Sequence, residues 1–423
     1  MSSTRTGGSG PRTTDVVVVG GGQAGMAMSH CLTRAGIDHV VLERGGTAES
    51  WRTERWDSLR LLTPNWMTRV PGHSYEGPDP DGFMTATEVA AFISSYAASF
   101  GAPVLAGTTV ASVVPVDGGY VVDTDRGRWR TRAVVIATGA CSDPHVPAVA
   151  QDLPGHLVQV TPSDYRNPGQ LPDRPVLVVG GSASGAQIAD ELARSGRAVT
   201  LATGEHVRLP RTYRGMDIHW WMDTIGMLDE RYDEVEDIER ARRLPSLQLV
   251  GSPELRDLDL NALTARGVTV VGRLGGIDGA RALFAGSLDN VCRLADLKQR
   301  RLLDRIDEFA TEHGLDAELG EPSRPAATVV DPDRLDADLT AFGAVVWATG
   351  FRPRYPWLDR SLLAPSGRLR HDGGVLEAPG LYALGLTFQR RRKSSFLDGV
   401  GPDAVELLPH LVRHLDGASS QVR

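Results

Sequence analysis

Cysteine is scarce in this sequence. The chain has three cysteines, Cys31, Cys141 and Cys292, and no Cys-x-x-Cys pair, which excludes a disulfide framework, a dithiol redox centre and a thiolate zinc site. The histidines show no metal-ligand spacing either, so we predict no metal site. Unpaired thiols are typical of a reducing compartment, and we therefore expect a cytoplasmic protein.

An excess of positive charge and long apolar runs are also missing. The 45 Lys and Arg residues face 53 Asp and Glu residues, and the net charge of −8 argues against a general nucleic-acid or anionic-membrane binder. Residues 89–116 carry no charge, but Gly101-Ala102-Pro103 interrupts them, so we expect no membrane span. Residues 1–13 lack the apolar core of a signal peptide and are expected to form a flexible tail.

Glycine, in contrast, is abundant and follows apolar runs. The 423 residues include 47 glycines and predict two or three domains. Residues 15–19 are typical of a buried parallel strand that ends in a glycine turn. Helical spacing then predicts a helix over 23–35, and a second strand is expected over 39–42. This order is a β-α-β unit, so the predicted fold class is α/β.

The first unit carries a dinucleotide-binding pattern. Gly20-x-Gly22-x-x-Gly25 opens the helix directly after the strand, and Glu43 closes the next strand. The first glycine permits the turn, the second lets the backbone approach a pyrophosphate, and the third brings the helix against the strand. Glu43 would accept hydrogen bonds from ribose hydroxyl groups, and the positive end of the helix would attract phosphate. The alternative is a glycine-rich turn that binds nothing.

A second unit of the same order lies 160 residues downstream, counted from Gly20 to Gly180. The motif there is Gly180-x-Ser182-x-x-Gly185, with a strand expected over 176–179 and a helix over 186–194. Serine replaces the middle glycine, so the motif is weaker than the first. Its place in a repeated unit favours a second dinucleotide site.

The residues after the next strand bear on which nucleotide binds in the second unit. Thr203 stands where Glu43 stands in the first unit, and Arg208 and Arg211 follow shortly. Arginines in this region would suit a 2′-phosphate, which favours NADP over NAD, although the nearby Glu205 leaves NAD open. The alternative for both arginines is ordinary surface charge.

The middle and the end of the chain indicate one domain inserted into another. Residues 108–136 predict a small antiparallel meander that leads into a buried strand. Two strands, over 133–136 and 344–347, both end in Ala-Thr-Gly and bracket the second unit. The proline-rich residues 151–175 are the expected linker.

These motifs resemble the flavoproteins with two dinucleotide-binding domains, FAD in the first and NADPH in the second. Four further motifs resemble the class B flavin-dependent monooxygenases, in particular the compact bacterial members: Glu49-Ser50-Trp51-Arg52, Asp57-Ser58-Leu59-Arg60, Asp164-Tyr165-Arg166-Asn167-Pro168 and Ser394-Ser395-Phe396-Leu397-Asp398-Gly399-Val400-Gly401. The resemblance covers nearly the whole chain after Thr14. It implies FAD, NADPH and O2, with one oxygen atom inserted into a small organic substrate through a flavin C4a-peroxide.

The resemblance also implies the domain organisation. An FAD-binding domain is expected over 14–150 and 344–423, and an NADP-binding domain over 165–343 with a helical insertion at about 213–262. The implied partners are a small-molecule substrate and O2, without nucleic acid or membrane, and a homodimer is compatible with the sequence.

The sequence departs from the pattern of this family in two places. Leu62 stands where an Asn usually follows the Ser of Ser-Leu near the flavin, with Asn65 three residues later. Thr161-Pro162 stands in the linker where His-Ser is usual. Both usual residues keep the nicotinamide and the flavin peroxide in register. An NADPH-dependent flavin oxidase or reductase that releases hydrogen peroxide is therefore the alternative function, and a sensory flavoprotein without turnover is the third.

Near the C-terminus, Gly401-Pro402-Asp403 is expected to start a final helix whose N-terminus faces the flavin. The basic run 390–393 is either a solvated loop or a clamp for an acidic group. The catalytic candidates are Asn65, Leu62 and Asp398. The candidate cofactor-binding residues are Gly20, Gly22, Gln23, Ala24, Gly25, Glu43, Arg44, Trp51, Arg60, Val110, Ala137, Thr138, Gly139, Gly180, Ser182, Ser184, Gly185, Arg208, Arg211, Ala348, Thr349, Gly350 and Gly401.

Overall fold

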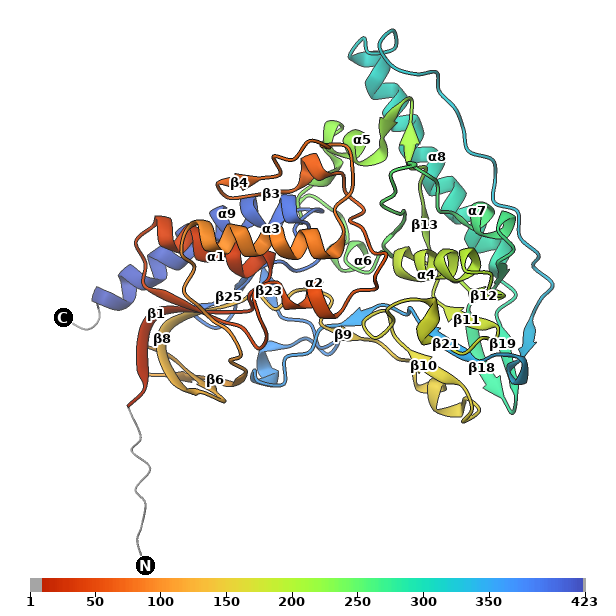
Figure 1. Ribbon diagram of the computed structural model, residues 1–423. Coiled ribbons are helices and arrows are strands. Elements are labelled where there is room, and N and C mark those ends of the chain that lie inside the picture. Colours follow the sequence, from red (N-terminus) through yellow and green to blue (C-terminus); the bar gives the residue numbers. More distant parts are fainter. Residues whose placement is uncertain (1–9, 421–423) are drawn as a thin grey trace, which may run out of the picture.

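Two sheets, one mixed and one parallel, with helices packed on them organise the protein, of which a computed structural model describes residues 10–420 (Figure 1). The first sheet lies near both described ends of the chain, and the second lies at the opposite end of the molecule. This arrangement confirms the predicted α/β class with two dinucleotide-binding units.

The first sheet has the strand order β23-β24-β25-β8-β1-β2-β5, with the meander of β6 and β7 attached to β8. Its strands are β1 (Arg12–Val19), β2 (His39–Leu42), β5 (Val104–Leu105), β6 (Val110–Val116), β7 (Gly119–Thr124), β8 (Gly127–Ile136), β23 (His371–Asp372), β24 (Val375–Leu376) and β25 (Leu381–Ala383). The predicted meander and the strand that follows it are confirmed, because β7 pairs antiparallel with both β6 and β8.

Strand β1 lies in the interior of the first sheet, and both of its faces are covered. It pairs in parallel with β2 and β8, and residues 16–19 are at most 5% exposed. Val16 and Val18 pack against α1 (Gln23–Arg34), α3 (Ala86–Ser99) and α9 (Leu397–Ser420), whereas Val17 and Val19 face the core under the meander. A strand buried on both sides is a continuous apolar run, as its sequence predicted.

The second sheet is wholly parallel and has the order β10-β21-β11-β12-β17. Its strands are β10 (Val158–Val160), β11 (Val176–Val179), β12 (Val199–Ala202), β17 (Thr269–Val271) and β21 (Ala344–Trp347). One face is covered by α4 (Ala183–Arg194), α7 (Leu260–Ala265) and α8 (Leu288–Glu312). The other faces a small sheet of β18 (Leu274–Asp278), β19 (Arg281–Phe284) and β20 (Asp336–Asp338).

The remaining elements are short. They include the helices α2 (Glu49–Thr53), α5 (Ile218–Thr224) and α6 (Ile238–Ala241), and the strands β3 (Arg69–Val70), β4 (His73–Ser74), β13 (Val207–Arg208), β14 (Thr212–Tyr213), β15 (Met216–Asp217) and β16 (Leu247–Gln248). The helical insertion expected at about 213–262 is therefore mostly loop, because these helices are only four to seven residues long.

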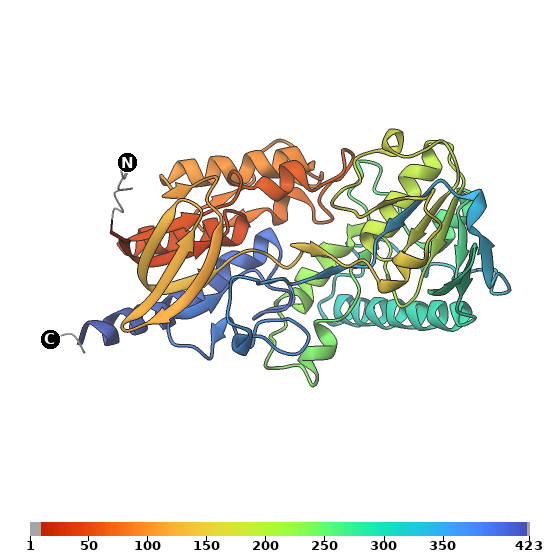
Figure 2. The same cartoon turned by 90° about the horizontal axis from the view of Figure 1, so that it is seen from below.

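Two chain segments connect the sheets, as expected for an inserted unit. One contains β9 (Asp143–Pro144) and the other contains β22 (Phe351–Arg352), and the two strands pair antiparallel. Figure 2 shows both segments running side by side between the halves of the molecule. The expected domain boundary at residue 344 does not lie in these connecting segments. Residue 344 begins β21, which belongs to the second sheet. The expected linker 151–175 likewise contributes β10 to that sheet.

Three other expectations about elements differ from the structure. Residues 12 and 13 of the expected tail belong to β1, where they pair with Trp129 and Arg130, and residues 1–9 lie outside the described part. The final helix begins at Leu397, so Pro402 lies inside it rather than at its first turn. The long helix α8 was not predicted. Within residues 10–420, no helix combines the length and apolarity needed to cross a membrane.

Candidate cofactor sites

The turn between β1 and α1 has the backbone that its glycines require. Gly20 has φ +112°, and a Cβ there would press on the Ala137 carbonyl at the end of β8. A Cβ on Gly25 would collide with the Gly20 carbonyl, so this glycine allows α1 to pack on the turn. A Cβ on Gly22 would meet no atom within 4 Å, so this position opens onto free space where a ligand could approach the backbone.

The turn between β11 and α4 repeats this geometry. Gly180 has φ +111° beside the Ala348 carbonyl, and Gly185 packs on the Gly180 carbonyl. The N-cap residues Gly22 and Ser182 have φ, ψ of −85°, −169° and −83°, −171°. Serine therefore replaces the middle glycine without changing the backbone, because an extended φ is open to any residue.

Both motif helices begin without a side-chain cap. Neither Gly22 nor Ser182 provides a side-chain hydrogen bond to the first turn of its helix. In contrast, α3, α5, α6 and α7 are all capped by a Thr or Asp side chain. The first N–H groups of α1 are thus available to an anion such as a pyrophosphate, whereas the Ala183 N–H at the start of α4 donates to the Ser246 hydroxyl group at 3.3 Å.

Glu43 is held at the expected position after β2. One carboxylate oxygen accepts from the Gly21 N–H at 2.6 Å and the other from the Gly45 N–H at 2.8 Å. The carboxylate therefore stands beside the glycine turn at the carboxyl end of the sheet. Ala137 to Gly139 follow β8 at the same edge, and Ala348 to Gly350 follow β21 in the second sheet.

Trp51 lies against the start of α1. Its indole N–H donates to the Gln23 side-chain oxygen at 3.3 Å, and the Arg55 guanidinium lies 5.2 Å from the centre of its ring system. The Gln23 amide in turn reaches the Ser395 carbonyl at 3.5 Å, just before α9. Three segments far apart in the sequence therefore meet at the first glycine turn.

The structure contradicts the 2′-phosphate role predicted for Arg208 and Arg211. Arg208 is 2% exposed and pairs with Asp259 and Asp296, at 2.7 Å in each case. Arg211 is fully buried, pairs with Asp217, and donates to the Leu62 carbonyl at 2.8 Å. Both guanidinium groups are enclosed by carboxylates and hold loops together, so neither is available to a nucleotide.

Asn65 is engaged in holding the chain. It is 4% exposed, its amide donates to the Asp79 carbonyl at 2.9 Å, and its side-chain oxygen accepts from the Met84 N–H at 2.8 Å. Its side chain is thus not available as a catalytic amide. Leu62 is half-buried and packs against the same apolar cluster as Trp66, Trp220 and Phe396.

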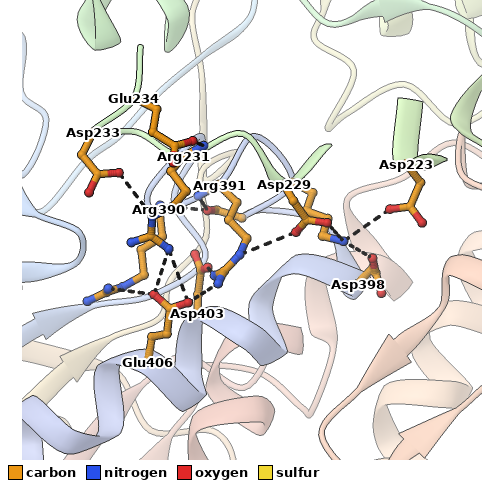
Figure 3. Close-up of polar contacts among 12 residues, drawn as sticks. Asp223, Asp229, Arg231, Asp233, Glu234, Arg390, Arg391, Asp398, Asp403 and Glu406 are labelled. Atoms are coloured by element: carbon orange, nitrogen blue, oxygen red, sulfur yellow. Dashed lines mark hydrogen bonds and ion pairs between the residues drawn. The ribbon is translucent and has the colours of Figure 1, made fainter. Parts of the chain in front are cut away.

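Asp398, the third catalytic candidate, forms part of a network of ion pairs (Figure 3). Its side chain is 6% exposed and contacts Arg69 at 2.6 Å and Lys393 at 2.9 Å. Lys393 also contacts Asp229 at 3.1 Å. These cations stabilise the carboxylate, and Asp398 connects α9 to the segment that precedes it.

The basic run 390–393 belongs to the same network and is therefore not a solvated loop. Arg391 pairs with Asp403 and Glu406 of α9, Arg392 pairs with Glu230, and Arg390 pairs with Glu406. Arg231 contacts Glu406 as well, at 3.3 Å. The network therefore fastens the segment 223–234 to α9.

Several other cofactor candidates have partners within the protein. Arg44 forms an exposed ion pair with Glu54, and Arg60 donates to the Phe83 carbonyl at 2.7 Å. Val110 begins β6. Gly401 lies inside α9, where a Cβ would press on Pro71, so it allows a close approach of helix and loop.

Comparison with known proteins adds the family. The sequence pattern described as pyridine nucleotide-disulphide oxidoreductase matches residues 17–223. An uncharacterised oxidoreductase named CzcO-like, from Geobacillus kaustophilus, is 31% identical over 403 residues, which are 95% of this chain and 99% of that protein. The chain belongs to the CzcO-like oxidoreductases.

Two further proteins extend the likeness of this CzcO-like chain. The indole-3-pyruvate monooxygenase YUCCA1 of Oryza sativa subsp. japonica is 29% identical, over 88% of this chain and 86% of that protein. The structure of a flavin-containing monooxygenase from Stenotrophomonas maltophilia has a TM-score of 0.66 at 22% identity, over 95% of this chain and 99% of that one. These findings confirm the predicted flavin-dependent oxidoreductase and its resemblance to flavin monooxygenases.

The sequence prediction missed an arginine that lies beside the second nucleotide site. Arg273 follows β17, the neighbour of β12, and its side chain lies 3.5 Å from where Gly204 would carry a Cβ. Arg273 is exposed, and no ion pair of its guanidinium is found among residues 10–420. Arg273 lies far from Gly204 in the sequence, so the sequence did not indicate that the two residues are close in the structure.

Proposed function

We propose that this CzcO-like protein is an NADPH-dependent flavin monooxygenase that transfers one oxygen atom from O2 to a small organic substrate. The observation that carries the proposal is the repeated glycine turn that leads into a helix, once at the edge of each sheet. Two such sites in one chain suit an enzyme in which one dinucleotide passes electrons to another.

The first turn fits FAD. Gly22 leaves open space above the backbone, the first N–H groups of α1 would hold the pyrophosphate, and Glu43 would accept from the ribose. Trp51 and Ser395 stand beside the same turn through Gln23 and would flank the ring system. When bound, FAD supplies hydride acceptance and the reaction with O2, and the protein positions, shields and neutralises charge.

The second turn fits NADPH, with Arg273 in place of the arginines predicted from the sequence. In a β-α-β unit the ribose 2′ position is met just after the second strand, here at Thr203 and Gly204. Gly204 has no side chain, and Arg273 fills the adjacent space. Glu205 is paired with Lys298 at 2.7 Å, which holds its pKa below the usual value and reduces its repulsion of a phosphate.

Leu62 supports oxygenation rather than uncoupled peroxide release. Leu62 packs against the same buried apolar cluster as Trp66, Trp220 and Phe396, and an apolar side chain there would keep water from the reacting groups. The alternative, an NADPH-dependent flavin oxidase or reductase that releases hydrogen peroxide, is favoured by the engagement of Asn65 with Asp79 and Met84. No side-chain amide from Asn65 is then available to support oxygen transfer.

The first experiment is anaerobic mixing of the FAD-loaded protein with NADPH, followed by flavin absorbance. Rapid bleaching of the flavin with NADPH supports an enzyme with two communicating sites. A flavin that stays oxidised for minutes with excess NADPH contradicts the proposal and favours a sensory flavoprotein.

A further inference from the structure

A cavity of about 680 Å³ lies away from both glycine turns, where β23 and β24 extend the edge of the first sheet. The segment 232–242 closes it on one side, and Arg390 and His410 complete its lining. None of the residues that surround the cavity belongs to the proposed FAD or NADPH sites.

Arginine side chains dominate the polar part of this cavity, which is lined by Arg242, Arg368, Arg370 and Arg390. Their carboxylate partners in the wall are loosely placed: Glu239 lies 3.3 Å from Arg242 and 3.9 Å from Arg368, and Glu377 lies 3.3 Å from Arg370. Arg242 also donates to the Phe388 carbonyl at 3.3 Å, and Arg370 also donates to the Ser361 carbonyl. A guanidinium carries five N–H donors, so each of these arginines keeps donors that these contacts do not use.

Arg390 adds a largely buried guanidinium to the lining. The residue is 93% buried, and its Nε–H has no hydrogen-bond partner although the guanidinium also contacts Glu406 at 3.2 Å. A buried donor without an acceptor is unfavourable by about 1 to 3 kcal/mol.

His371 supplies a further donor. Its Nδ1 accepts from the Gly374 N–H at 3.2 Å, so in the neutral ring the proton lies on Nε2. Burial lowers the pKa of His371 to about 4, which keeps the ring neutral at pH 7. Leu369, Val375 and Leu376 form an apolar floor next to these donors.

We propose that this cavity binds a small organic anion, whose carboxylate or phosphate group is held by Arg242, Arg368 and Arg390 and whose apolar body rests on Leu369 and Leu376. The donors match oxyanions because arginine presents planar pairs of N–H groups to carboxylate and phosphate oxygens. The cavity is large enough for an aromatic acid or an aryl phosphate. Arg390 also pairs with Glu406 of α9. A ligand bound to Arg390 would therefore contact the segment that precedes the motif over residues 394–401.

The test is calorimetric titration of the FAD-loaded protein, with saturating NADP⁺ present so that the second nucleotide site is filled. The probes are 1-naphthoate, 1-naphthyl phosphate and the neutral 1-naphthalenemethanol. We expect at least one anion to bind about tenfold or more tightly than the neutral probe, and the stronger of the two identifies the oxyanion.

Variants locate the binding. Arg368→Ala and Arg242→Ala should each weaken the anion about tenfold or more, while FAD content and circular dichroism stay unchanged. Arg293→Ala, which removes an exposed arginine of α8 that pairs only with its own helix in the described part, is the matched control. Equal affinity for anions and the neutral probe, or equal anion binding in all variants, would overturn the proposal.

Discussion

Gly22 and Gly25 lie in the same turn, but substitution of Gly22 should affect ligand binding alone, whereas substitution of Gly25 should also affect folding. A Cβ at Gly22 meets no protein atom within 4 Å, whereas a Cβ at Gly25 collides with the Gly20 carbonyl. Gly22→Val should therefore fold like the wild-type apoprotein and lose FAD affinity by at least about tenfold, because the valine occupies the space of the pyrophosphate. Thermal unfolding and flavin absorbance measure the two effects.

Gly25→Val is the control for that prediction, since its collision with backbone should lower stability as well as FAD content. If Gly22→Val retains stoichiometric FAD, the assignment of the first turn fails.

Arg273 is expected to decide the choice between NADPH and NADH. Arg273→Ala should weaken NADPH about tenfold to a hundredfold and leave NADH nearly unchanged, because only NADPH carries the 2′-phosphate. Arg208→Ala should instead reduce stability, since it leaves Asp259 and Asp296 without their buried cation. Initial rates with each nucleotide test this, and equal losses for both nucleotides in Arg273→Ala would remove the residue from the site.

Leu62 tests whether an apolar wall limits peroxide release. Leu62→Asn places a polar amide against the apolar cluster on which Leu62 packs and should draw in water, which raises the hydrogen peroxide released per NADPH oxidised. Leu62→Met keeps the wall apolar and should behave like the wild type. A lower peroxide ratio in Leu62→Asn would instead mean that the position lacks a polar group that oxygen transfer needs.

The glycine motifs could be predicted from the sequence because each glycine is required by the conformation or the packing of a single turn. The arginines could not. Arg208 and Arg211 stand at a suitable distance along the chain, but their burial depends on Asp259, Asp296 and Asp217, and those contacts form only in the folded chain. Arg273 reaches Gly204 for a similar reason, since β17 lies beside β12 only once the sheet has formed.

At the scale of elements, strands next to glycine turns were predictable and helix limits were less so. The sequence of α8 does carry a helical signal, because Leu288, Cys292, Ala295, Gln299, Leu303, Ile306 and Ala310 are its buried residues and recur every three or four positions. The start of α9 was misplaced because Pro402 is typical of a first turn, yet the helix begins five residues earlier.

Helix α9 depends on a buried cation for its attachment to the preceding segment. The Asp403 side chain is fully buried, and burial raises its pKa even though Arg391 contacts it at 2.6 Å. Arg391→Met should lower the free energy of unfolding by about 3 to 5 kcal/mol, because it leaves a buried carboxylate without its partner. Adding Asp403→Asn should recover part of that loss.

Urea denaturation of the single and double variants measures this coupling, with Arg293→Ala as the exposed control that should change stability by less than about 1 kcal/mol. If Arg391→Met unfolds like the control, the network does not hold α9.

At the scale of the whole molecule, the insertion of one unit into another was predictable and its exact boundary was not. The strands over 133–136 and 344–347 have the same apolar pattern and the same Ala-Thr-Gly ending, so both were expected near the boundary. Such a pattern indicates burial on both faces but does not identify the neighbouring strands. The structure places Ala344–Trp347 between β10 and β11, in the second sheet.

In the proposed reaction, NADPH and O2 convert the substrate into an oxygenated product and water, whereas the uncoupled reaction reduces O2 to hydrogen peroxide. The most direct test measures NADPH oxidation and hydrogen peroxide together, with indole-3-pyruvate, organic sulfides, amines and ketones as candidate substrates. We expect that at least one compound speeds NADPH oxidation while the amount of hydrogen peroxide released per NADPH oxidised falls well below one. A ratio that stays at one with every compound would contradict it and assign the protein to the flavin oxidases.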